Sequence, residues 1–149
     1  MTQGLVIVLW LMLCAVQDIR QRQIANGLTL GVGLVALIYL LWMGVTWIGA
    51  PASEGGWAFA LAMLLGVPGY VLGRFGAGDV KLLAALGLAT TTEYLLWSLI
   101  GAAVAMGARA VVAQRLSARV VSGPDQAPTK QPFAPYLLTG FTLYVFWIH

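Results

Sequence analysis

Charge is scarce in this chain of 149 residues. Only 9% of the residues are Asp, Glu, Lys or Arg, whereas 60% are hydrophobic and the mean hydropathy is +0.88. Soluble domains carry about 25% charged residues, so this sequence lacks the polar side chains to cover a water-exposed surface. It predicts an all-α, polytopic membrane protein. At about 20 residues for each spanning helix, residues 1–149 allow about six spans in a single transmembrane domain.

Cysteine and histidine are equally scarce, with one residue of each, Cys14 and His149. A single cysteine excludes an internal disulfide and any zinc or redox site that needs a Cys-x-x-Cys pair. We therefore expect no metal and no cofactor, and we interpret Cys14 as a small core residue. The formal net charge of +3 comes without a cluster of Lys and Arg. Nucleic-acid binding needs such a cluster, so none is expected.

Long apolar runs are what the sequence has in abundance, and they alternate with short polar turns that contain Gly, Pro and Ser. They predict helices at about 4–20, 28–48, 57–72, 79–89, 94–112 and 133–148. The segment at about 113–131 is polar and contains two prolines. We expect it to be a mobile cytoplasmic loop.

The distribution of charge predicts the orientation in the membrane. Lys and Arg accumulate on the cytoplasmic side of membrane proteins. With six spans, all eight Lys and Arg residues fall in or beside the connections that follow the first, third and fifth helices. Glu54 and Glu93 fall at the opposite side. Both termini are therefore expected outside, in the periplasm.

Five acidic residues remain to be assigned, and three of them have an ordinary explanation. Glu54 and Glu93 lie in short external turns, and Asp125 lies in the long polar loop. Asp18 and Asp79 instead fall at helix ends on the cytoplasmic side. A carboxylate at the edge of the hydrocarbon is costly and marks a functional site by default. The sequence therefore predicts a site that contains these two aspartates.

The surroundings of Asp79 strengthen this prediction. Gly76 and Gly78 precede it, and glycine allows a second chain to approach the backbone closely. Asp79 would lie at the positive end of a helix dipole. Two carboxylates held close together share a proton, so one can activate water while the other hydrogen-bonds a substrate carbonyl. This chemistry needs no metal and no nucleophilic side chain.

Purely structural interpretations stand beside the functional one. Asp18 and Arg22 have the i, i+4 spacing of a helical ion pair, which is worth about 0.2–0.5 kcal/mol. Asp79 could be the N-cap of its helix. Lys81 could extend to the lipid headgroups. None of these explains why the two juxtamembrane acids share one side of the membrane.

Three blocks of the sequence resemble motifs of the type IV prepilin peptidase family. The members of this family are GxGD-type membrane aspartyl proteases. The three blocks are residues 18–26 (DIRQRQIAN), residues 76–82 (GAGDVKL), and the start of the last helix at 132–136 (PFAPY) with Gly140. The resemblance implies that Asp18 and Asp79 are the catalytic pair. It also implies that the loop admitting the substrate is shaped by Gly76 and Gly78, with supporting positions at Arg22, Asn26 and Lys81.

The resemblance also suggests a branch of the family. Ala25 stands where proline is usual, which predicts a looser turn after the first helix. The paired cysteines of the larger bifunctional members are missing, so we expect peptidase activity without N-methyltransferase activity. This is similar to the short branch that serves Flp-type (tight-adherence) pili. The implied substrate is a prepilin or pseudopilin with a basic leader, cut at the cytoplasmic face of the bacterial inner membrane.

Two other functions stay open at this point. Intramembrane acids often mark ion pathways, so the chain could be a proton- or cation-binding membrane protein. It could also be a catalytically inactive pilus-assembly factor. Cleavage of a prepilin would separate the protease from both.

Overall fold

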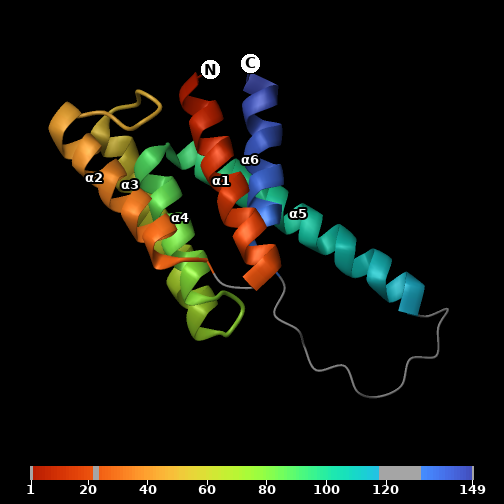
Figure 1. Cartoon of the computed structure of the whole chain (residues 1–149). Coiled ribbons are helices and arrows are strands. Elements are labelled where there is room, and N and C mark those ends of the chain that lie inside the picture. The colour runs from red at the N-terminus through yellow and green to blue at the C-terminus, as the bar shows by residue number, and fades with distance from the viewer. Residues whose placement is uncertain (1, 22–23, 118–131, 149) are drawn as a thin grey trace.

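The computed structural model describes residues 2–21, 24–117 and 132–148. Six helices form within these ranges (Figure 1): α1 (Thr2–Gln21), α2 (Asn26–Met43), α3 (Ala52–Val71), α4 (Ala77–Ala89), α5 (Thr92–Ser117) and α6 (Ala134–Ile148). Among the described residues α1, α2 and α5 are long and apolar enough to cross a membrane, and α6 is a shorter apolar helix. The prediction of an all-α, polytopic membrane protein is confirmed.

The turn between α2 and α3 differs from its prediction. The second helix was expected to reach residue 48, but it ends at Met43 because Gly44 adopts a left-handed conformation with φ of 70°. Glycine adopts such a conformation without a steric penalty and commonly ends helices. The third helix begins at Ala52 instead of 57, directly after Pro51. The turn, residues 44–51, therefore has the same length as the expected loop at 49–56 but lies five positions closer to the N-terminus.

The fifth helix is longer than expected. It was predicted to end at about 112, but α5 continues to Ser117. The first residues of the expected cytoplasmic loop, 113–117, are therefore helical. The remainder of that loop, residues 118–131, lies outside the described residues, and its mobility stays a prediction.

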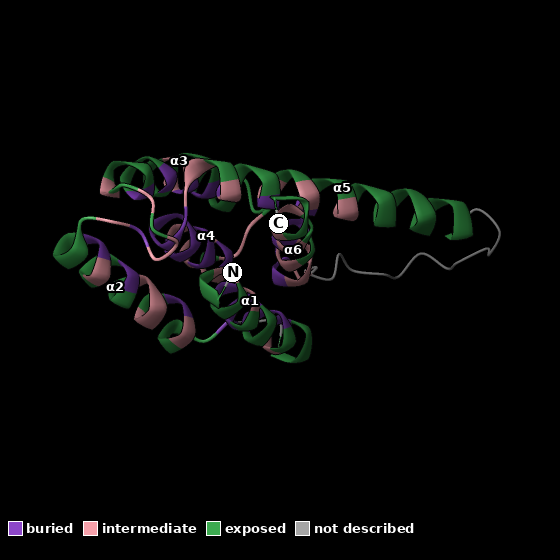
Figure 2. Ribbon diagram, turned by 90° about the horizontal axis from the view of Figure 1, so that it is seen from above, coloured by how far each residue is buried: buried purple, intermediate pink, exposed green. Residues whose placement is uncertain are grey.

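The short helix α4 forms the centre of one half of the bundle. It packs against α2 and α3, while α1 packs on α6 and α6 packs on α5. Seen from above, α4 lies between α2 and α3 and is largely buried (Figure 2). Asp18 on α1 and Asp79 on α4 therefore belong to different groups of helices, which share one hydrophobic core.

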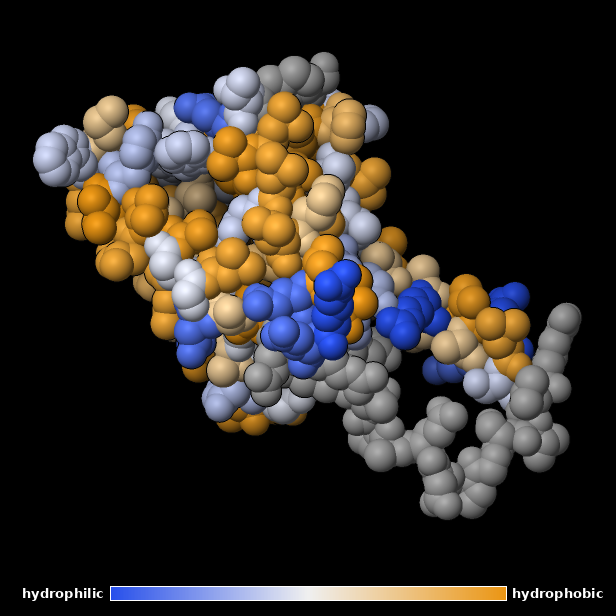
Figure 3. All heavy atoms as spheres, viewed as in Figure 1, coloured by the Kyte–Doolittle hydropathy of each residue, from blue (hydrophilic) through white to orange (hydrophobic). Residues whose placement is uncertain are grey.

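The outer surface is apolar over much of its height. Leu41, Trp42 and Trp147 are 75%, 85% and 87% exposed. Figure 3 shows hydrophobic residues over the middle of one face and hydrophilic residues toward its upper and lower ends. Water would destabilise such a surface, whereas lipid tails would not. This band is therefore the lipid-facing surface of the molecule.

Two glycines set the crossing of α5 and α6. A Cβ atom added to Gly101 would lie 2.4 Å from the Cα of Gly140, and one added to Gly140 would lie 2.4 Å from the carbonyl oxygen of Ser98. Small residues allow such close backbone contact between membrane helices. The crossing fixes the position of α6, whose first residue contacts the site described next.

Candidate active site

Asp18 lies in the last turn of α1 and is only 5% exposed. Its Oδ2 atom accepts a hydrogen bond of 3.0 Å from the backbone N–H of Ala134. Ala134 is the first residue of α6, and the N–H groups of a first helical turn have no partner within their own helix. Asp18 therefore caps α6 from a helix that lies far away in the sequence.

Asp79 lies in the first turn of α4 and is 6% exposed. Its Oδ2 atom accepts a hydrogen bond of 2.9 Å from the backbone N–H of Gly76. The N–H of Asp79 donates in turn to the carbonyl of Gly76, at 3.1 Å. The structure thus makes Gly76 the cap and Asp79 the third residue after it, instead of Asp79 being the N-cap. Its predicted place at the start of a helix is confirmed.

The two carboxylates share two features. Each is buried, and each accepts a backbone N–H at the start of a helix. A buried polar group must be hydrogen-bonded to avoid a large desolvation cost, and helix N-termini bind anions well. The end of α1 and the beginnings of α4 and α6 lie toward the same end of the bundle (Figure 1).

An aromatic contact joins the two chain segments that hold the aspartates. Phe75 directly precedes Gly76, and Phe133 directly precedes Ala134. The centroids of the two rings are 5.0 Å apart, with the rings tilted by 53°. Phe133 is 5% exposed. A series of contacts therefore runs from Asp18 through α6 and both rings to Asp79.

Two of the predicted supporting residues contact each other. Lys81 Nζ donates a hydrogen bond of 2.8 Å to Oδ1 of Asn26. This bond ties α4 to the first residue of α2. Arg22, the third predicted supporting residue, lies outside the described residues.

Gly78 faces the connection between α1 and α2. A Cβ atom added to Gly78 would lie 3.6 Å from the Cβ of Ile24, which is ordinary van der Waals contact. The fold therefore has space for alanine at this position. For Gly76, φ is −82° and ψ is 162°, an extended conformation that other residues also adopt.

Ala25, which stands where the family usually has proline, makes a hydrogen bond that proline could not make. The backbone N–H of Ala25 donates a hydrogen bond of 2.9 Å to Oε1 of Gln17. Proline has no N–H and could not make this bond. The hydrogen bond from Ala25 to Gln17 thus holds the turn after α1 against α1, and a proline at position 25 would remove it.

Several contact residues of the site were not predicted. Sequence reasoning selects side chains by their chemistry, whereas Ala134 contributes a backbone N–H group. Gly76 was predicted to shape the loop, but its backbone N–H bond to Asp79 was not predicted. Phe75 and Phe133 look like ordinary apolar residues in the sequence. The one available signal was the block at 132–136, which the resemblance had already selected.

A comparison with protein families identifies the family of this chain. The model of the type IV leader peptidase family matches residues 5–111, more than half of the chain, and the matched range contains both buried aspartates. Searches among curated proteins and among solved structures gave no match. The chain therefore belongs to the type IV leader peptidase family, and it is a membrane peptidase of the kind that acts on prepilin leader peptides.

Proposed function

We propose that this protein removes the basic leader from Flp-type prepilins or pseudopilins, with Asp18 and Asp79 as its catalytic pair. The proposal is supported by the burial and hydrogen bonding that these two residues share. They are two buried carboxylates from different helices, each fixed by a backbone N–H at the start of a helix. Glu54 and Glu93, by contrast, lie in the first turns of α3 and α5 and are exposed.

The reaction would follow the general acid–base route of paired carboxylates. One carboxylate takes a proton from water, and the oxygen of that water attacks the scissile carbonyl carbon. The other, protonated carboxyl group donates its hydrogen to the carbonyl oxygen, which gives a tetrahedral intermediate. A proton then passes to the amide nitrogen and the C–N bond breaks. The products are a leader with a new carboxyl terminus and a pilin with a new amino terminus.

We place this chemistry at the cytoplasmic face of the bacterial inner membrane. The described Lys and Arg residues support this placement, because Arg20, Arg74 and Lys81 lie on helices or turns next to the aspartates. Glu93, at the start of α5, accepts a hydrogen bond from the Tyr144 hydroxyl near the other end of α6. Positive charge near the aspartates and negative charge at the far end match the positive-inside pattern.

The test is cleavage of an Flp-type prepilin co-expressed with the parent protein, with Asp18→Asn or with Asp79→Asn. We expect leader removal by the parent and a loss of about 100-fold or more in either variant, in the range of general acid–base contributions. Loss of the leader is followed by gel shift, and the mass of the product shows whether its new amino terminus is unmethylated. Glu54→Gln is the matched control and should retain activity.

Each outcome tests one part of the proposal. Cleavage that survives in either aspartate variant rejects the catalytic pair. A folded parent that cleaves none of several Flp-type prepilins rejects the proposed substrate class. A product that carries an N-methyl group rejects the expected absence of methyltransferase activity.

A further inference from the structure

We propose that Phe75 and Phe133 are positioning residues that hold the two aspartates in register across the two halves of the bundle. This inference rests on the proposed role of Asp18 and Asp79. It begins with the observation that α1 packs on α6, whereas α4 packs on α2 and α3. The aspartates belong to different halves, and the ring contact links the start of α6 to the turn before α4 in addition to the hydrophobic core that the halves share.

Each aspartate accepts a hydrogen bond from a backbone N–H that follows a phenylalanine. Asp18 binds the N–H of Ala134, so its carboxylate moves with the beginning of α6. Asp79 binds the N–H of Gly76, so its carboxylate moves with the turn between α3 and α4. In both cases the donor is the residue directly after a phenylalanine. Displacing either phenylalanine therefore displaces the backbone N–H that holds a carboxylate.

Each ring is itself held from its own side. Phe133 is 5% exposed, and its carbonyl accepts the N–H groups of Tyr136 and Leu137 in the first turn of α6. The Phe75 ring packs over Gly69 of α3, where an added Cβ atom would lie 2.3 Å from Cδ2 of the ring. The N–H of Phe75 also donates to the carbonyl of Gly69, at 3.0 Å. The ring contact thus joins the end of α3 to the start of α6.

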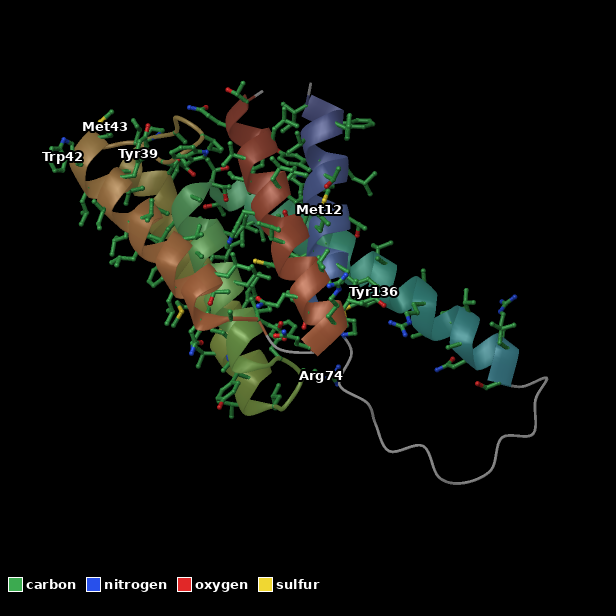
Figure 4. All side chains as sticks on the ribbon, in the orientation of Figure 1. Met12, Tyr39, Trp42, Met43, Arg74 and Tyr136 are labelled. Atoms are coloured by element: carbon green, nitrogen blue, oxygen red, sulfur yellow. The ribbon has the colours of Figure 1, made fainter. Side chains whose placement is uncertain are left out.

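The contact between the rings has the geometry of a specific aromatic pair. Centroids 5.0 Å apart with a tilt of 53° fall within the preferred range for interacting aromatic side chains. The pair lies toward the end of the bundle where Figure 4 labels Arg74, the residue before Phe75. Tyr39, Trp42 and Met43 are labelled at the opposite end. The contact is therefore placed to act on the site.

Steady-state cleavage of the prepilin by Phe75→Ala, Phe133→Ala and the double variant tests the proposal. Small displacements of reacting groups can reduce rates by up to about 100-fold, so we expect kcat to fall between about 10-fold and 100-fold, with KM unchanged. Since either substitution breaks the same contact, the double variant should be no worse than the more impaired single variant. Phe133→Leu keeps an apolar side chain, so its kcat should lie between those of Phe133→Ala and the parent.

Tyr39→Ala is the matched control, because Tyr39 forms an aromatic pair with Trp47, with centroids 5.3 Å apart, at the far end of α2. It should leave kcat within about twofold of the parent, since it contacts no part of the site. Equal losses of kcat in Tyr39→Ala and Phe75→Ala would overturn the positioning role. So would losses from Phe75→Ala and Phe133→Ala that multiply in the double variant.

A distance measurement tests the same idea without using activity. Arg20 and Arg74 are exposed, so cysteines introduced there take spin labels, while Cys14 is fully buried. We expect a narrow distribution of label distances in the parent and a broader one in Phe75→Ala or Phe133→Ala. Unchanged distributions overturn the proposal. If the parent does not cleave prepilin but the distribution broadens as expected, the proposed function fails and the coupling of the two halves stands.

Discussion

At the scale of the residue, Asp18 combines a charge with a hydrogen-bond acceptor, and substitutions can separate the two. Asparagine keeps an oxygen that can accept the N–H of Ala134, whereas alanine removes it. Replacing a capping side chain by alanine costs about 0.5–2 kcal/mol. We therefore expect Asp18→Ala to lower the free energy of unfolding by about that amount, and Asp18→Asn by less. Denaturant titration of the purified protein in detergent measures both, and neither variant should cleave prepilin.

The comparison distinguishes a structural aspartate from a catalytic one. If Asp18→Asn and Asp18→Ala lowered the free energy of unfolding equally, the hydrogen bond from Ala134 to the side chain at position 18 would not stabilise the fold. Cleavage by the stable asparagine variant would mean that Asp18 is only a cap for α6. If the asparagine variant is folded but inactive, the negative charge of Asp18 is needed for catalysis, and its hydrogen-bond acceptor oxygen stabilises the fold.

At the scale of the element, the crossing of α5 and α6 positions the start of α6. A Cβ atom at Gly140 would lie 2.4 Å from the carbonyl oxygen of Ser98, so Gly140→Ala must push the helices apart. Overpacking of this kind costs about 1–3 kcal/mol. We expect a lower thermal midpoint together with reduced cleavage, because the N–H of Ala134 moves with α6.

Gly107→Ala is the control on the same pair of helices. It lies on α5, and an added Cβ atom would meet no other atom within 4 Å. Alanine is a better helix former than glycine by about 1 kcal/mol, so this variant should be neutral or slightly stabilised and fully active. If Gly140→Ala behaved like Gly107→Ala, the close crossing of α5 and α6 would be wrong.

At the scale of the whole molecule, the proposed orientation predicts which positions are accessible from each side of the membrane. Ser53 at the start of α3 and Arg20 at the end of α1 are both exposed and lie at opposite ends of the bundle (Figure 1). We expect Ser53→Cys to react with a membrane-impermeant maleimide applied from the periplasm. Arg20→Cys should react only after the membrane is opened. The parent, whose single Cys14 is buried, should stay unlabelled.

The reverse pattern of labelling would show that the aspartates face the periplasm and would contradict the proposed cleavage at the cytoplasmic boundary. Labelling of both positions from one side would contradict the placement of the end of α1 and the start of α3 at opposite ends of the bundle. Either result would leave the family membership intact, because that rests on the sequence match over residues 5–111.

The sequence by itself determined the class of the protein and the number of helices, and it selected the two aspartates that the structure shows to be buried. Composition dictates a lipid-facing surface, and apolar runs interrupted by Gly and Pro dictate helices and turns. Helix ends were less accessible, since the end of α2 at Met43 depends on the left-handed conformation of Gly44. That conformation is not distinguishable in the sequence from those of the other glycines.

Only the tertiary structure decided what holds the aspartates. The donor to Asp18 is a backbone N–H at Ala134, 116 positions away in the sequence. Every residue except proline carries the same N–H group, so the sequence offers no chemical sign of which one is used. The choice follows from the packing of α6 on α1 and α5, which close contact at Gly101 and Gly140 makes possible. The pairing of Phe75 with Phe133 is non-local for the same reason, since it exists only when both halves of the bundle are assembled.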